Sequence, residues 1–253
     1  MAQWNQQRMF VSAGVVVIAV GILMVGIFVP GNRKAATPGD ETQDARGGER
    51  STGTAMSLHA AAALGDTESL RDALAGDERI DAMYAGDDPA MAQMTPLMLA
   101  AQGGHAETVQ AIIDQDAQLD TARAGGMTAL MFAAQSGSGD TLMAMLNAGA
   151  SRDIKTERGR GTLFFAAQGG DARCVEILLE SGQDANAADA GGVAPLMVAA
   201  EAARTNAVLA LLDAGADAFA TDALGKTALD RVDGRTDADS QSVFGILRDA
   251  TRP

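Results

Sequence analysis

The chain has 253 residues and a formal net charge of −14, with 21% charged and 47% hydrophobic residues. This composition supports a packed core and excludes a disordered polyelectrolyte. The acidic balance argues against nucleic acid as a partner, because phosphate binding needs clustered cations. One cysteine and two histidines exclude a disulfide framework and leave most metal chemistry without ligands, so we expect no cofactor and no metal site.

The first predicted element is a transmembrane helix over residues 9–29, which follows a short N-terminal tail of residues 1–8. Met9–Val29 contains no charged residue, and at about 1.5 Å per residue it reaches across the roughly 30 Å of a bilayer core. A cleaved signal peptide has a shorter apolar region and a small-residue cleavage site. We therefore favour an uncleaved single-pass anchor. Cleavage is the alternative, and it would leave a secreted or periplasmic soluble binder or inhibitor.

The cations around this segment bear on its orientation. Arg8 precedes it, whereas Arg33, Lys34, Arg46 and Arg50 follow it. Because cations accumulate on the cytoplasmic side of a membrane helix, this count favours a cytoplasmic C-terminal domain. Acidic residues lie among these cations, however, so a periplasmic or other extracytoplasmic side stays open. The preference for Arg over Lys and the abundance of Ala and Gly indicate a GC-rich bacterial genome, hence a bacterial inner membrane.

Residues 30–55 are predicted to form a flexible linker. Gly31–Ala55 contains no aromatic and no large aliphatic residue, so it has no apolar area to bury. The domain that follows would then be tethered to the membrane through residues 9–29.

The strongest signal in the chain is an internal repeat within residues 56–253. Leucines recur at separations of 39, 33, 33, 33 and 33 residues, and each opens a short segment that is alanine-rich in all but the last unit. A second apolar stretch and a polar stretch follow. One such unit cannot bury its own apolar face, so the units are expected to stack into a solenoid. The recurring residues are Leu58, Leu97, Leu130, Leu163, Leu196 and Leu229.

These units resemble the ankyrin repeat family over about residues 56–250. The matching segments are Thr95-Pro96-Leu97, Thr128-Ala129-Leu130, Ala194-Pro195-Leu196 and Gly225-Lys226-Thr227-Ala228-Leu229. The resemblance implies an all-α ankyrin repeat solenoid of about six helix-turn-helix repeats, which start near residues 56, 95, 128, 161, 194 and 227, preceded by the transmembrane helix.

The ends of the helices have their own sequence signals. Threonines at the start of a helix offer an oxygen to its free N–H groups, and glycines end a helix where φ is positive. We expect the first role for Thr95, Thr128 and Thr227, and the second for Gly149, Gly182 and Gly215.

The family resemblance also implies that a protein partner binds on the concave surface. The second residue after each leucine is implied to project there, beside a row of mostly glutamine residues. These apolar anchors and amides suit an extended or helical peptide. The alternative is that the apolar side chains only pack locally. The apolar positions are Leu99, Phe132, Phe165 and Val198, and the flanking row is Gln102, Gln135, Gln168 and Glu201.

A basic cluster stands out from the acidic background. It consists of Arg152, Lys155, Arg158 and Arg160, with Arg123 in the preceding repeat. Such a cluster can bind an acidic partner through guanidinium–carboxylate pairs. It can equally be a solvated loop whose own acidic residues neutralise it.

No residue pattern points to catalysis. The chain has no glycine-rich loop between a strand and a helix and no credible Ser/His/acid set. The carboxylates between residues 76 and 94 lack the spacing of a calcium loop. We therefore expect a non-catalytic scaffold without catalytic residues and without a small-molecule substrate.

Overall fold

The computed structural model describes residues 57–75, 79–89 and 91–252. The predicted N-terminal tail, transmembrane helix and linker lie outside these residues. Within the described ranges, no helix combines the length and the apolar character that crossing a bilayer requires. The only strand-like pairing described is an isolated bridge between Ala122 and Thr128, so the all-helical class of the repeat domain is confirmed.

The helices come in pairs along the chain. In chain order they are α1 (Leu58–Leu64), α2 (Thr67–Ala75), α3 (Pro96–Gly103), α4 (Ala106–Ile113), α5 (Ala129–Ser136), α6 (Gly139–Asn147), α7 (Thr162–Gly169), α8 (Ala172–Glu180), α9 (Pro195–Glu201), α10 (Thr205–Asp213), the short 3-10 helix η1 (Leu229–Arg231) and α11 (Ala238–Ala250).

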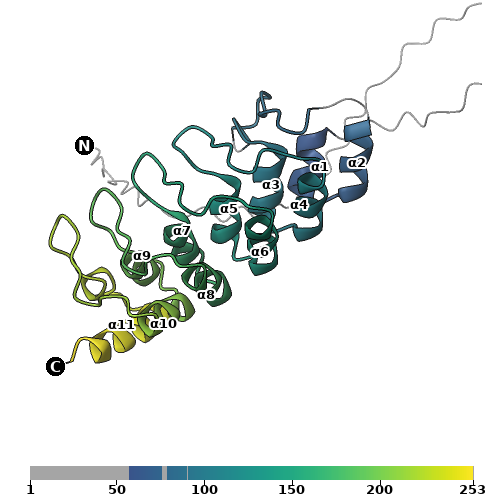
Figure 1. The fold of residues 1–253 in the computed structure, drawn as a ribbon. Coiled ribbons are helices and arrows are strands. Elements are labelled where there is room, and N and C mark those ends of the chain that lie inside the picture. Colours follow the sequence, from purple (N-terminus) through teal and green to yellow (C-terminus); the bar gives the residue numbers. More distant parts are fainter. Residues whose placement is uncertain (1–56, 76–78, 90, 253) are drawn as a thin grey trace, which may run out of the picture. The chain divides into compact units, whose positions relative to one another are not determined.

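The pairs stack in two layers (Figure 1). The first-helix layer contains α1, α3, α5, α7 and α9, and each of these helices contacts the next one in the layer. The second-helix layer contains α2, α4, α6, α8 and α10, which also contact their neighbours in order. Long loops join each second helix to the next first helix, and those between α4 and η1 project from the first-helix side (Figure 1).

The ends of the helices follow local chemistry. Thr95 Oγ1 accepts a hydrogen bond from the N–H of Met98, and Pro96 occupies the first turn of α3. Thr128 was predicted to cap α5 in the same way, and this is wrong: its backbone pairs with Ala122 instead, and its buried Oγ1 has no partner among the described residues. Thr227 exchanges hydrogen bonds with Asp230 at the start of η1, which is a 3-10 helix rather than an α-helix.

Alanine pairs let the helices of the first layer approach closely. Ala100 and Ala101 in α3, with their counterparts in α5, α7 and α9, are fully buried. The second helices contribute larger side chains such as Val109 and Ile112, also fully buried. The core therefore runs through every repeat between the two layers. Gly149, Gly182 and Gly215 have φ values of 93°, 93° and 83°, which confirms their predicted role after the second helices.

Neighbouring long loops are joined by backbone hydrogen bonds near their tips. Each bond connects residues 32 positions apart, so the same contact recurs from one repeat to the next. The bonds run from Glu157 N to Gly125 O (3.2 Å), from Ala190 N to Arg158 O (2.9 Å) and from Ala223 N to Gly191 O (2.9 Å).

The C-terminal end of the stack is closed by an arginine. Arg231 donates to Asp222 at 2.6 Å and to Glu201 at 2.5 Å. The side chain of Asp222 is almost fully buried. Helix α11 then packs against α9, α10 and η1.

Candidate protein-binding surface

The apolar row of the predicted site lies in the first-helix layer. Leu99, Phe132, Phe165 and Val198 have exposed fractions of 4%, 4%, 5% and 7% and belong to the hydrophobic core. Side chains this well covered leave a partner almost nothing to contact. The structure thus favours the packing interpretation for these four residues over direct contact with a partner.

The flanking row is accessible and partly ordered by its own hydrogen bonds. Gln102 is exposed, whereas Gln135 and Gln168 are half-buried. The Nε2 of Gln135 donates to the Oε1 of Gln168 at 2.8 Å, which links α5 to α7. Glu201, at the next position in the row, is exposed and binds Arg231. This row thus presents amide groups up to α7 and a paired carboxylate at α9.

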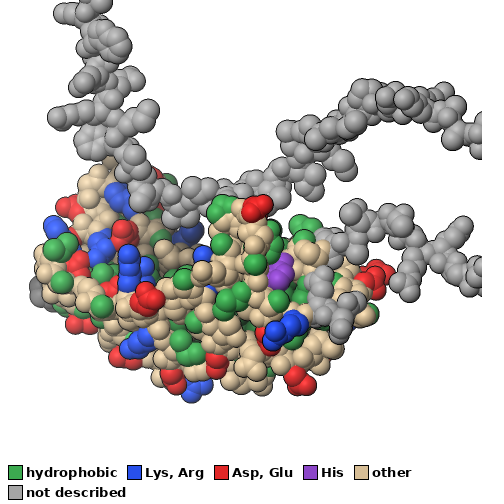
Figure 2. Space-filling view, turned by 90° about the horizontal axis from the view of Figure 1, so that it is seen from above, with side chains coloured by type: hydrophobic (Ala, Val, Ile, Leu, Met, Phe, Trp, Pro, Cys, Tyr) green, Lys and Arg blue, Asp and Glu red, His purple; other side chains and the backbone are tan. Residues whose placement is uncertain are grey.

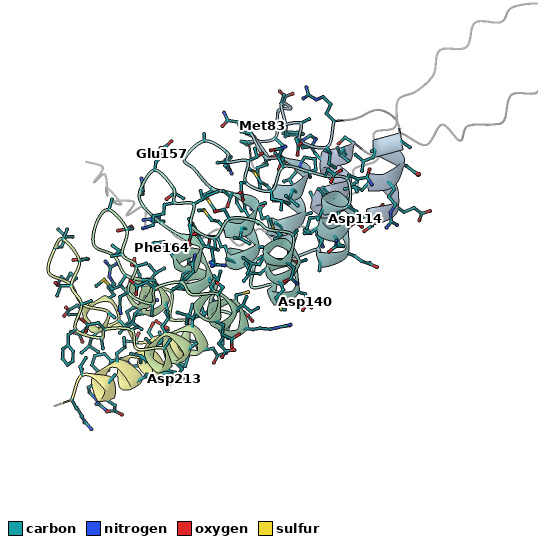
Figure 3. The ribbon with its side chains drawn as sticks, in the orientation of Figure 1. Met83, Asp114, Asp140, Glu157, Phe164 and Asp213 are labelled. Atoms are coloured by element: carbon teal, nitrogen blue, oxygen red, sulfur yellow. The ribbon has the colours of Figure 1, made fainter. Side chains whose placement is uncertain are left out.

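The first-helix layer differs from the second-helix layer in charge. Helices α1, α3, α5 and α7 contain no Asp, Glu, Lys or Arg. The second-helix layer carries many carboxylates, and Figure 3 labels Asp114, Asp140 and Asp213 on the side that faces away from the long loops. The acidic residues in or directly after the second helices are Glu68, Asp72, Glu107, Asp114, Asp140, Glu176, Glu180 and Asp213, against Arg71 and Arg173.

One cation of the basic cluster, Arg160, forms an ion pair within the described residues, and the other four do not. Arg160 Nε donates to Asp189 Oδ2 at 3.1 Å, and its guanidinium carbon lies 4.5 Å from the ring centroid of Phe164. Arg160 therefore joins loop 148–161 to loop 181–194 and covers the start of α7. The partner that neutralises it is a residue of this chain, so Arg160 is the member of the cluster with least charge to offer another protein.

The other four cations have no ion-pair partner among the described residues. Arg152, Lys155 and Arg158 are exposed on loop 148–161, and Arg123 is half-buried on loop 114–128. Figure 2 shows Lys and Arg side chains gathered over the C-terminal half of the loop face, with Asp and Glu side chains between them. The five long loops are residues 76–95, 114–128, 148–161, 181–194 and 214–228, and 148–161 is the one in which Lys and Arg outnumber Asp and Glu.

The carboxylate of Asp189 is ionised and is fixed in place by hydrogen bonds. Burial alone would raise its pKa, but hydrogen bonds from the N–H groups of Val193 and Gly191 and from Arg160 outweigh burial and hold the pKa below the ordinary value of 3.8. These bonds fix the tip of loop 181–194 through Asp189 Oδ1 (2.8 Å to Gly191 N, 3.1 Å to Val193 N). The carboxylate thus serves the loop structure.

No group of three His, Cys, Asp or Glu side chains within the described ranges is placed to hold a metal ion. Cys174 is buried in α8, and desolvation, with a smaller contribution from Asp171, raises the pKa of its thiol to about 12. Such a thiol is a poor nucleophile at neutral pH.

Two residues of this surface were missed by the sequence interpretation. Gln183 stands where three other repeats have a buried alanine, and Gly161 stands where α3 and α5 have a threonine. Gln183 Oε1 accepts from the N–H of Leu163 at 3.2 Å, and its Nε2 donates to the carbonyl of Arg152 at 2.5 Å. Aligning the repeats position by position would have shown both departures together. The three alanines are Ala117, Ala150 and Ala216.

The comparisons with known proteins agree with this architecture. A family model described as "Ankyrin repeats (3 copies)" matches residues 58–156 and 131–222, which together make up more than half of the chain. No curated protein matches the chain. The period, the stacked helix pairs and the family match lead to one conclusion: the chain belongs to the ankyrin repeat family.

Proposed function

We propose that the chain is a non-catalytic scaffold, tethered to a membrane through residues 9–29, that binds a protein partner on the first-helix layer and the long loops. Ankyrin repeats are in general interaction domains without catalytic activity. The observation that carries the choice of surface is the absence of charged residues from α1, α3, α5 and α7 beside a strongly acidic second-helix layer. Cores of protein interfaces are depleted in charged residues, because each buried charge must be desolvated.

The glutamine row gives this surface a way to orient a partner. Gln135 and Gln168 are held by one mutual hydrogen bond, and each amide keeps further donors or acceptors for a partner. The buried apolar row beneath them fixes the spacing of the first helices. We therefore place the contacts on Gln102, Gln135, Gln168 and the free cations of the loops, with Leu99, Phe132, Phe165 and Val198 as their support.

The binding surface is tested by site-specific photo-crosslinking in cells. A photoreactive residue is introduced at Gln102, which is exposed on α3, and in a matched variant at Glu180, which is exposed on α8. The proposal expects a discrete crosslinked protein from position 102 and none from position 180. Equal crosslinking at both positions, or crosslinking at position 180 alone, would contradict the choice of surface.

The membrane tether needs its own experiment. The tagged full-length protein is treated with protease in intact cells, spheroplasts and detergent, and the intact mass is recorded. If the chain has an inner-membrane anchor and a cytoplasmic repeat domain, we expect full-length protein that is cut only after detergent is added. Cutting in spheroplasts would place the domain outside the inner membrane, and a mass lacking the first thirty-odd residues would favour the secreted or periplasmic binder.

A further inference from the structure

A pocket of about 220 Å³ lies between loop 148–161 and the first residues of loop 181–194. Three glycines and Ala187 line the pocket together with Leu163 and Phe164, whose side chains are only 2% and 4% exposed, whereas Arg152 and Lys155 are exposed at its edge. Figure 3 places Phe164 where loop 148–161 meets α7. Drug-sized ligands occupy pockets of about 300–1,000 Å³. This one therefore has the size for a single side chain of a partner.

The pocket lies at a junction that lacks a hydrogen bond found at the neighbouring junctions. In three places, a side-chain oxygen of one long loop accepts the backbone N–H of a residue at the base of the next loop, each at 2.8 Å. The 33-residue period predicts the same bond from Asp184 N to Asp153. No such bond is present, and neither group has a hydrogen-bond partner within the described part of the chain. The three bonds run from Gln118 N to Asp81, from Ser151 N to Asp120 and from Asp217 N to Asn186.

Gln183 accounts for this interruption. At the other junctions a buried alanine occupies its position, whereas the Gln183 side chain reaches between Leu163 N and the carbonyl of Arg152. Gly161 adds space, because a Cβ atom built on it would meet no atom within 4 Å. The two substitutions together leave one unused donor, the N–H of Asp184, and one unused acceptor, the carboxylate of Asp153, at the edge of the pocket.

A peptide group has both a donor and an acceptor, and so matches the unused pair at this junction. We propose that the pocket takes one large apolar side chain of a partner peptide, whose backbone binds Asp153 and Asp184 and whose neighbouring carboxylate binds Arg152 or Lys155. This inference rests on the proposed scaffold function and specifies the chemistry of its partner. The carboxylate determines which loop the peptide binds. Loop 148–161 is the one long loop with excess positive charge, and on the other long loops an acidic peptide would meet excess negative charge.

The test uses the full-length protein in detergent and a displayed library of random twelve-residue peptides. Selections run in parallel on the wild type and on Gly161→Leu. Position 161 has φ −90° and ψ 179°, a backbone conformation that any residue adopts, and the surrounding space is open, so this variant fills the pocket without strain. Unchanged helical circular dichroism verifies its fold. We expect peptides enriched on the wild type alone that share one large apolar residue with Asp or Glu within two positions.

Affinities of the best peptide then separate the contacts. Gly161→Leu is expected to weaken binding by about 30-fold or more, as for a central anchor, and Lys155→Glu and Asp153→Ala by about three- to tenfold each. Arg71→Glu is the matched control, because it makes the same charge reversal at an exposed arginine of α2, in the second-helix layer, and Arg71 does not line the pocket. It is expected to change binding by less than about twofold.

Three results would overturn the pocket. They are peptides that bind the wild type and Gly161→Leu equally, peptides enriched in Lys and Arg around the apolar residue, and the absence of any peptide specific for the wild type. Equal binding would leave the scaffold function standing, because the partner would then bind elsewhere on the domain. Loss of the scaffold function is instead read from the crosslinking at position 102.

Discussion

The side-chain oxygen of Gln183 accepts a hydrogen bond from the backbone N–H of Leu163 at 3.2 Å. At the start of α3, the side-chain oxygen that accepts a backbone N–H belongs to Thr95, the residue directly before the helix. In α7 that position is Gly161, which has no side chain to offer, and the capping oxygen comes from a different loop. A helix start is thus stabilised by a long-range contact where a local one is missing.

Replacing Gln183 with alanine is therefore expected to lower the free energy of unfolding by about 1 kcal/mol, the typical value of one helix cap or one neutral hydrogen bond. Urea unfolding followed by circular dichroism measures this change. Alanine is the residue of the other repeats here, so the variant introduces no overpacking. In the Gln183→Ala background, Gly161→Thr supplies a local cap and should recover most of the loss. No recovery would show that Gln183 acts through another contact.

The arginine at the C-terminal end gives a second prediction. Arg231→Met removes the partner of the nearly buried Asp222 carboxylate and leaves that charge uncompensated. We expect faster amide hydrogen exchange in α10 and α11 and little change in α3–α6, because each repeat contacts only its neighbours. Glu201→Gln serves as the control, since it removes only the exposed ion pair. Uniformly faster exchange along the whole stack would contradict this local role.

Acid is expected to destabilise the domain through its loop aspartates. The N–H of Lys226 is the largest cause holding the pKa of Asp222 below 3.8; burial opposes it, and Leu224 N–H and Arg231 add to it. A lowered folded pKa stabilises the folded state above the unfolded value of 3.8, and this stabilisation is lost as the pH falls through the folded pKa. The urea concentration at the midpoint of unfolding should therefore decrease as the pH is lowered below about 4.

The matched comparison for the acid prediction is the double variant Asp189→Asn, Asp222→Asn. It is expected to be less stable at pH 7 and to lose less stability between pH 5 and pH 2. An unchanged pH dependence would show that these two carboxylates titrate alike in the folded and unfolded chains.

Cys174 offers a probe of local opening. With a pKa of about 12, about one thiol in ten thousand is ionised at pH 8. We expect negligible reaction with a thiol reagent such as dithionitrobenzoate in the native protein and full reaction of the single cysteine in urea. The rate in water then reports how often α8 opens. Rapid reaction without urea would mean that α8 is poorly packed.

The 33-residue period of the sequence predicts most of the fold. Because stacked repeats place the same position in the same environment, the glycines after α6, α8 and α10 and the alanine pairs of the first helices are predictable from spacing alone. The burial of Phe132 and Phe165 is different. A first helix has neighbours on both sides within its layer, and sequence spacing does not say how far those neighbours cover a given side chain.

The candidate site depends on departures from the period, and these are harder to predict. Arg160 appeared as one cation among several, yet its charge is used by Asp189 in the next loop. Gln183 and Gly161 lie 22 residues apart in the sequence, and their relation emerges only where the loop of one repeat meets the helix of another. Contacts between unlike positions of neighbouring repeats follow no period.

The acidity of the second-helix layer also decides how copies of the protein meet one another. Two copies that approach with these layers facing repel each other once they come within about a Debye length, roughly 10 Å at 0.1 M salt. The uncharged helices of the first layer have no comparable repulsion. Repulsion between copies thus comes from the second-helix layer. Raising the salt concentration should screen that repulsion and leave the interactions of the uncharged first-layer helices unchanged.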